Sequence, residues 1–186
     1  KWVPFLGTGC WALDMPYMKR YSAATLAKHP ELKGKDIETT RNSCAKFVHT
    51  PTTIINFVEG SRCTPEKQRA KNSPFTHLLP PKAGGIAFTL ASMGEQFNAI
   101  LDFTLLYPDN PQHVAMDMLM GKLKRVVVQV EVLPVDQQVI GDYFNDEQFR
   151  QRFQLWLNQR WQHKDQLIMQ YHQRQSLSSS SEQLAC

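Results

Sequence analysis

Phe57-Val58-Glu59-Gly60-Ser61-Arg62 is the stretch that best indicates the fold of this chain of 186 residues. It begins at the end of a run rich in β-branched residues, and that run predicts a buried strand over 52–57. Gly60 lets the backbone turn sharply after the strand and leaves space for a ligand. Arg62 has a planar guanidinium group that suits a phosphate, and Ser61 adds a hydroxyl donor. Because ligands of α/β folds collect at the carboxyl ends of strands, this turn is a candidate anion-binding site.

The segment after the turn bears on how the turn is interpreted. On its own, the tetrapeptide 59–62 could equally be a surface turn closed by a salt bridge. The segment that follows it is basic, with Lys67, Arg69, Lys71 and Lys82. Gly84 and Gly85 then open a predicted helix, whose free N–H groups could receive a phosphate beside Lys82. The alternative is that these two glycines only permit close packing.

The longer pattern around the turn resembles a known motif. Thr64-Pro65-Glu66-Lys67 follows the turn, and Leu78-Leu79-Pro80-Pro81-Lys82-Ala83-Gly84-Gly85 closes the segment. Together they resemble the third motif of the glycerolipid (1-acylglycerol-3-phosphate, PlsC-like) acyltransferases, often written Phe-Pro-Glu-Gly-Thr-Arg. Within that family they are most similar to the branch with the lysocardiolipin acyltransferases and the bacterial YihG-like proteins. The resemblance runs from about Trp2 to Asn110, and Ser61 keeps the hydroxyl of the family's usual Thr.

The resemblance implies roles for the residues at the matching positions. Arg62 and Ser61, at the Gly60 turn, would bind the phosphate of an acyl acceptor. Arg20 stands where the family's second motif ends in an arginine, so it would help to hold that phosphate. Glu59 would orient the loop, either by pairing with an arginine or by accepting backbone N–H groups. The candidate substrate-binding set is therefore Glu59, Gly60, Ser61, Arg62, Arg20 and Lys82.

The order of the predicted elements favours an α/β fold with a mostly parallel mixed sheet flanked by helices. The predicted helices cover 34–49, 83–94, 112–120 and a long segment from Asn145, and the predicted strands cover 52–57, 99–108 and 123–134. Asn145 and Gln148 form a capping box for the last helix. Its apolar stripe predicts packing on the domain, with a membrane surface as the alternative: Phe149, Phe153, Trp156, Leu157 and Trp161.

Three parts of the chain are expected. Residues 1–142 would form an acyltransferase domain that is truncated at its N-terminus. Residues 143–174 would form the C-terminal amphipathic helix. Residues 175–186 are rich in serine, and this composition predicts a disordered tail.

Composition narrows the classes of protein to consider. The chain is 42% hydrophobic and 20% charged, as globular domains are. It contains no run of about 18 apolar residues, which is the length that a helix needs to span a bilayer. The four cysteines lack zinc-ligand spacing, so we expect reduced thiols and no metal: Cys10, Cys44, Cys63 and Cys186. Residues 1–82 carry 13 Lys and Arg against 6 Asp and Glu. This basic half favours an anionic substrate or an anionic membrane surface.

Acyl transfer to a hydroxyl needs a general base, and histidine has a suitable pKa. In the family this base is the His of a His-x4-Asp motif. None of the six histidines has Asp five positions later, and His113 with Asp117 is one residue too close. We therefore expect the catalytic motif to precede Lys1 in a longer protein, and no catalytic residue within this chain. The alternative is a relative that binds without chemistry.

The resemblance implies an acyltransferase that moves a fatty acyl group from acyl-CoA or acyl carrier protein to the hydroxyl of a lysophospholipid such as 1-acylglycerol-3-phosphate. It needs no cofactor beyond this acyl donor. We expect it at the cytoplasmic face of a bacterial inner membrane. A non-catalytic phospholipid- or CoA-binding protein is the alternative. Nucleic acid is not an expected partner, because the sequence lacks the aromatic and basic alternation of such surfaces.

Overall fold

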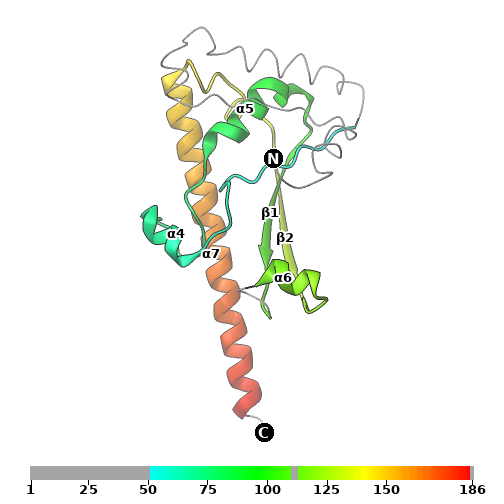
Figure 1. Ribbon diagram of the computed structural model, residues 1–186. Coiled ribbons are helices and arrows are strands. Elements are labelled where there is room, and N and C mark those ends of the chain that lie inside the picture. The colour runs from blue at the N-terminus through cyan, green and yellow to red at the C-terminus, as the bar shows by residue number, and fades with distance from the viewer. Residues whose placement is uncertain (1–50, 110–112, 185–186) are drawn as a thin grey trace.

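A computed structural model describes residues 51–109 and 113–184 of the chain (Figure 1). The elements in chain order are α4 (Pro65–Ala70), α5 (Ala83–Met93), the 3-10 turn η3 (Gly94–Gln96), β1 (Ile100–Leu106), α6 (Val114–Leu119), β2 (Val127–Leu133) and α7 (Glu147–Leu184). Figure 1 shows α4, α5 and the β1–β2 hairpin arranged along the long helix α7. The helix predicted at 34–49 and the candidate residue Arg20 lie outside the described residues.

The sheet differs from the prediction. In the described part of the chain it has two strands, which pair antiparallel from Ile100 opposite Leu133 to Leu106 opposite Val127. The predicted mostly parallel sheet is therefore not seen there. The strands predicted at 99–108 and 123–134 are present as β1 and β2, but a local sequence pattern carries no information on the relative direction of two strands.

The strand predicted at 52–57 is wrong for the described structure, where these residues belong to no strand. Ile55 is 77% exposed and Phe57 is 82% exposed, so the segment is not buried. β-Branched residues fit a pleated, half-buried surface, and they form a strand only where a neighbouring strand pairs with them. In the residues described, neither β1 nor β2 pairs with this segment.

The two faces of the β1–β2 hairpin are unlike each other. Asp102 and Thr104 of β1 point inward, and Glu131 of β2 contacts Arg160 of α7. The opposite face is apolar and exposed, with Leu101, Phe103 and Leu105 opposite Val132, Val130 and Val128. Val128, Val130 and Val132 of β2 share the exposed face, which points away from α7, whereas Val127 packs against the core.

The core is built on the apolar stripe of α7. Phe149, Phe153, Leu157 and Trp161 follow one another at i, i+4 spacing, and all four are buried, as predicted; Trp156 is half-buried beside them. They pack with Leu90 and other buried residues: Phe75, Leu78, Ala83, Ala87, Val139, Tyr143 and Ile168. Burying each large side chain stabilises the fold by roughly 1.5–3 kcal/mol. This core fixes the segment 75–87 against α7.

The N-terminal cap and the C-terminal end of α7 both differ from the prediction. Asp146 caps the helix in place of Asn145, because its Oδ1 accepts the N–H groups of Gln148 and Phe149 at 2.9 and 3.1 Å. The backbone remains helical through Leu184, where the composition predicted a disordered tail from residue 175. A helix that has already formed extends at little cost, and serine disfavours helix only slightly.

Candidate functional site

The candidate site starts at the turn around Gly60. The Gly60 N–H donates to the Phe57 carbonyl at 2.9 Å, and Gly60 has a φ of +68°. This left-handed conformation favours glycine. A Cβ atom at this position would lie 3.2 Å from Nζ of Lys82. The structure therefore places the amine of Lys82 directly against the glycine of the Glu-Gly-Ser-Arg turn.

The backbone around Lys82 holds this arrangement. The Lys82 N–H donates to the Val58 carbonyl at 2.9 Å, which fixes the start of α5 beside the turn. Lys82 is also the N-cap residue of α5, and no side chain caps the first turn of this helix. A Cβ atom at Gly84 would meet nothing within 4 Å, so close packing does not explain this glycine. The open first turn fits the interpretation in which helix N–H groups face an anion.

Glu59 joins two segments of the motif. Its Oε2 accepts the N–H of Leu79 at 3.2 Å, so the carboxylate orients the loop by binding a backbone N–H group. This is one of the two roles that the sequence indicated. Burial raises the pKa of Glu59, and the Leu79 N–H and the positive charge of Lys164 oppose that rise.

Ser61 and Arg62 are exposed at the end of the turn. Nζ of Lys67 donates to the Arg62 carbonyl at 3.2 Å and so ties α4 to the turn. Thr64 caps α4 by accepting the Lys67 N–H at 3.4 Å, and Pro65 begins the helix, where its missing N–H costs nothing. The arginine therefore has a fixed backbone, while its side chain is exposed.

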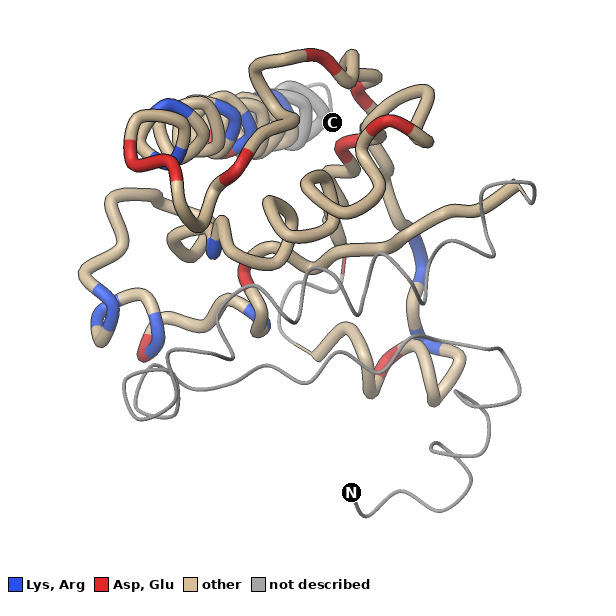
Figure 2. Tube along the Cα trace, turned by 90° about the horizontal axis from the view of Figure 1, so that it is seen from above, with Lys and Arg blue, Asp and Glu red and all other residues tan. Residues whose placement is uncertain are grey.

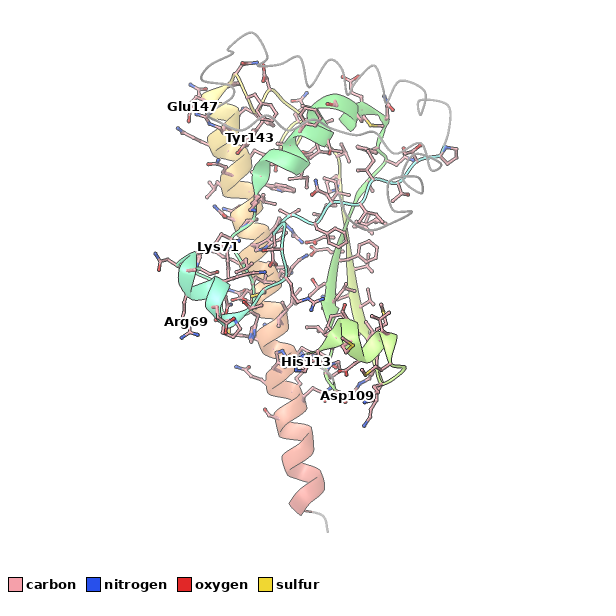
Figure 3. The ribbon with its side chains drawn as sticks, viewed as in Figure 1. Arg69, Lys71, Asp109, His113, Tyr143 and Glu147 are labelled. Carbon is pink, nitrogen blue, oxygen red and sulfur yellow. The ribbon has the colours of Figure 1, made fainter. Side chains whose placement is uncertain are left out.

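Three of the four basic residues after the turn belong to α4 and its C-cap: Lys67, Arg69 and Lys71. Arg69 lies in the last turn of α4 and Lys71 caps its C-terminus. Figure 2 shows Lys and Arg distributed over several elements, and Figure 3 labels Arg69 and Lys71 at α4. Arg69 is oriented by its own helix, because its Nε donates to the Pro65 carbonyl at 3.3 Å. Of the basic residues after the turn, Lys82 is the one placed against Gly60.

The loop between α4 and α5 is held by hydrogen bonds that the sequence did not reveal. Oδ2 and Oδ1 of Asp165, on α7, accept the N–H groups of Thr76 and His77 at 2.8 and 2.7 Å. Ser73 Oγ donates to the Leu78 carbonyl at 2.7 Å. Gln68 Nε2 donates to the Thr76 carbonyl at 2.8 Å. One signal for Asp165 was present: it continues the i, i+4 series of buried residues on α7, where an acid is unusual.

The described residues also bear on binding of a lipid chain or a metal ion and on membrane crossing. A pocket of about 130 Å³ lies between the start of α5 and α7, lined by Pro81, Ala83, Tyr143, Gln154, Leu157 and Asn158. Pockets for drug-sized ligands have about 300–1,000 Å³, so this one does not enclose a lipid chain. Within the same part of the chain, no group of three His, Cys, Asp or Glu residues could hold a metal ion. No helix there is long and apolar enough to cross a membrane.

Three proteins that are similar in sequence to this chain are acyltransferases by name. Lysocardiolipin acyltransferase 1 of Mus musculus is 24% identical over 138 residues, covering 68% of this chain and 34% of that protein. The protein of the same name from Gallus gallus is 22% identical over 137 residues, with the same coverage. An uncharacterized acyltransferase of Schizosaccharomyces pombe is 26% identical over 185 residues, covering 90% of this chain and 48% of that protein.

These similarities support an acyltransferase family for the chain. The chain spans between a third and a half of the length of these relatives. No protein-family model matches the sequence, and no solved structure matches it either. The relatives therefore support an acyltransferase family in general terms, and they do not identify the branch of the family, the acyl donor or the acceptor.

Proposed function

We propose that the protein containing this chain transfers a fatty acyl group from an acyl thioester, acyl-CoA or acyl carrier protein, to the hydroxyl of a lysophospholipid. The observation that carries this proposal is the contact between the Glu-Gly-Ser-Arg turn and Lys82, where a Cβ atom at Gly60 would lie 3.2 Å from Nζ. Two motif segments that are separate in the sequence meet there, because the Lys82 N–H also donates to the Val58 carbonyl. The acyltransferase relatives supply the reaction class.

The acceptor's phosphate is the group that this site would bind. The ammonium of Lys82 and the guanidinium of Arg62 are the charges, and Ser61 adds a hydroxyl donor. The absence of a side chain at Gly60 leaves room for the amine of Lys82 against the backbone, and this amine would bind a phosphate oxygen there. Glu59 holds the loop through Leu79 and is not a nucleophile in this proposal. Arg20 is proposed as a further phosphate ligand.

The reaction is a direct transfer. A general base takes the proton of the acceptor hydroxyl, the oxygen attacks the thioester carbonyl, and the thiolate of the donor leaves. We propose that a His-x4-Asp motif outside these 186 residues supplies the base, because no such motif occurs within them. The described residues would hold the acceptor's phosphate and so fix the position of its hydroxyl. A lysophospholipid acceptor also places the reaction at a membrane surface.

Replacing Arg62 with alanine tests the site. In the intact protein, Arg62→Ala should lower kcat/KM for the lysophospholipid by roughly 30-fold or more, since a charge-assisted contact to the phosphate is lost. The measurement is CoA release with acyl-CoA and lysophosphatidic acid.

Arg69→Ala is the matched control, because Arg69 lies on α4 close by and its Nε donates to its own helix. It should change kcat/KM less than about threefold, as surface substitutions do. Equal effects of the two variants would refute the assignment of Arg62. Wild-type protein that binds lysophosphatidic acid without releasing CoA would favour a binding protein over an enzyme.

A further inference from the structure

Asp165 is a buried acid in the middle of α7, with 7% of its surface exposed. Both of its carboxylate oxygens accept backbone N–H groups, from His77 at 2.7 Å and from Thr76 at 2.8 Å. A buried carboxylate is costly unless such bonds satisfy it, and N–H bonds to a charged oxygen are among the strongest in proteins. This pair of bonds is the most direct polar connection between α7 and the loop that precedes α5.

The loop passes this constraint on to the candidate site. Leu79, two residues beyond His77, is fully buried, and its N–H donates to Glu59 at 3.2 Å. Three residues later the N–H of Lys82 donates to the Val58 carbonyl, and the amine lies against Gly60. The segment from Thr76 to Lys82 is thus fixed to α7 at one end and to the phosphate-binding turn at the other.

The neighbour of Asp165 on α7 serves a different segment. Nζ of Lys164 binds the carboxylate of Asp102 and donates to the Phe103 carbonyl at 3.0 Å, so it grips β1. It also lies 5.0 Å from the ring centroid of Trp161. Successive residues of α7 therefore hold the hairpin and the loop separately. Lys164 is engaged by the hairpin, and both oxygens of Asp165 are engaged by the loop.

We infer that Asp165 is a positioning residue for the proposed phosphate site. Through Asp165, α7 helps to set the geometry of the acyl-acceptor site. This inference rests on the proposed function. Asp165 does not touch the acceptor. It sets the path of residues 76–79, which in turn place Lys82 beside Gly60.

The test is Asp165→Asn in the intact protein. Asparagine has nearly the same shape, but its NH2 group faces one of the two backbone N–H groups, so one bond is lost and a repulsion replaces it. The KM for lysophosphatidic acid should rise about tenfold or more, while the KM for acyl-CoA stays within about twofold. Hydrogen exchange should become faster at the amides of residues 76–79 and also at residues 59–62.

Asp146→Ala is the control on the same helix. Asp146 also accepts two backbone N–H groups, from Gln148 and Phe149, but these belong to α7 itself. Alanine removes both bonds, so this variant should lose thermal stability and speed exchange at 147–150, with the KM for lysophosphatidic acid unchanged. The contrast separates general destabilisation from positioning.

Two outcomes would overturn the inference. One is a loss of stability in Asp165→Asn with the KM for lysophosphatidic acid unchanged. The other is unchanged exchange at residues 59–62, which would show that the constraint does not reach the turn. Wild-type protein that transfers no acyl group would refute the proposed function instead, and the exchange measurement would then still decide whether Asp165 positions the loop.

Discussion

At the scale of single residues, Gly60 has a backbone conformation that favours glycine. Its φ of +68° is a conformation that side chains with a Cβ adopt at a cost of roughly 1–2 kcal/mol. A Cβ atom there would also meet Nζ and Cδ of Lys82 at 3.2 and 3.4 Å. Since that end of the lysine is flexible, it would move away. The glycine therefore matters for where the amine lies, besides its effect on stability.

Gly60→Ala should lower the free energy of unfolding by about 1–2 kcal/mol and raise the KM for a phosphate-bearing acceptor. Gly121→Ala is the control, because Gly121 has a φ of +67° but a Cβ atom there would meet nothing within 4 Å. The control should lose a similar amount of stability and keep its KM. Urea unfolding and acceptor titrations of both variants check this, and an equal rise in KM would contradict it.

At the scale of elements, ion pairs join the hairpin to α7. Lys164 binds Asp102 of β1, and Arg160 binds Glu131 of β2. Arg160 also lies 3.6 Å from Asp102, so Asp102 faces two cations. The side chains of Lys164 and Asp102 are 10% and 15% exposed, so water screens their interaction only weakly. The hairpin thus turns these charged residues toward α7, whereas antiparallel sheets usually turn their apolar face toward the rest of the protein.

Lys164→Met should destabilise the protein by about 2–4 kcal/mol, because it leaves the carboxylate of Asp102 with only the more distant Arg160. The double variant Lys164→Met with Asp102→Leu should recover part of this loss, since no charge remains unpaired. Arg150→Met is the control, because its partner Glu147 is exposed, and its cost should stay below about 1 kcal/mol. Urea unfolding gives the three values, and a double variant that is less stable than Lys164→Met would contradict the coupling.

At the scale of the whole molecule, local patterns predicted elements better than their arrangement. The helix at Ala83–Met93, both strands and the apolar stripe of α7 were predicted, because each is encoded by its own periodicity. The direction of the sheet was not, since it depends on how distant segments meet. The same holds for the site. The turn at Gly60 is visible in a few adjacent residues, whereas the bonds of Asp165 join positions 88 and 89 residues apart.

The arrangement also leaves one face of the hairpin exposed, with Phe103 and Val130 paired across the strands at 51% and 47% exposure. Replacing both by threonine should change the free energy of unfolding by less than about 1 kcal/mol from the wild-type value. Threonine suits strands, and these two side chains bury little apolar area that the substitutions would remove. Leu106→Ala is the control on the buried side of β1 and should cost about 2–5 kcal/mol. Urea unfolding compares them. If the double variant lost as much as Leu106→Ala, the face would be covered in solution, and an apolar surface of this extent would then form part of a larger core or interface.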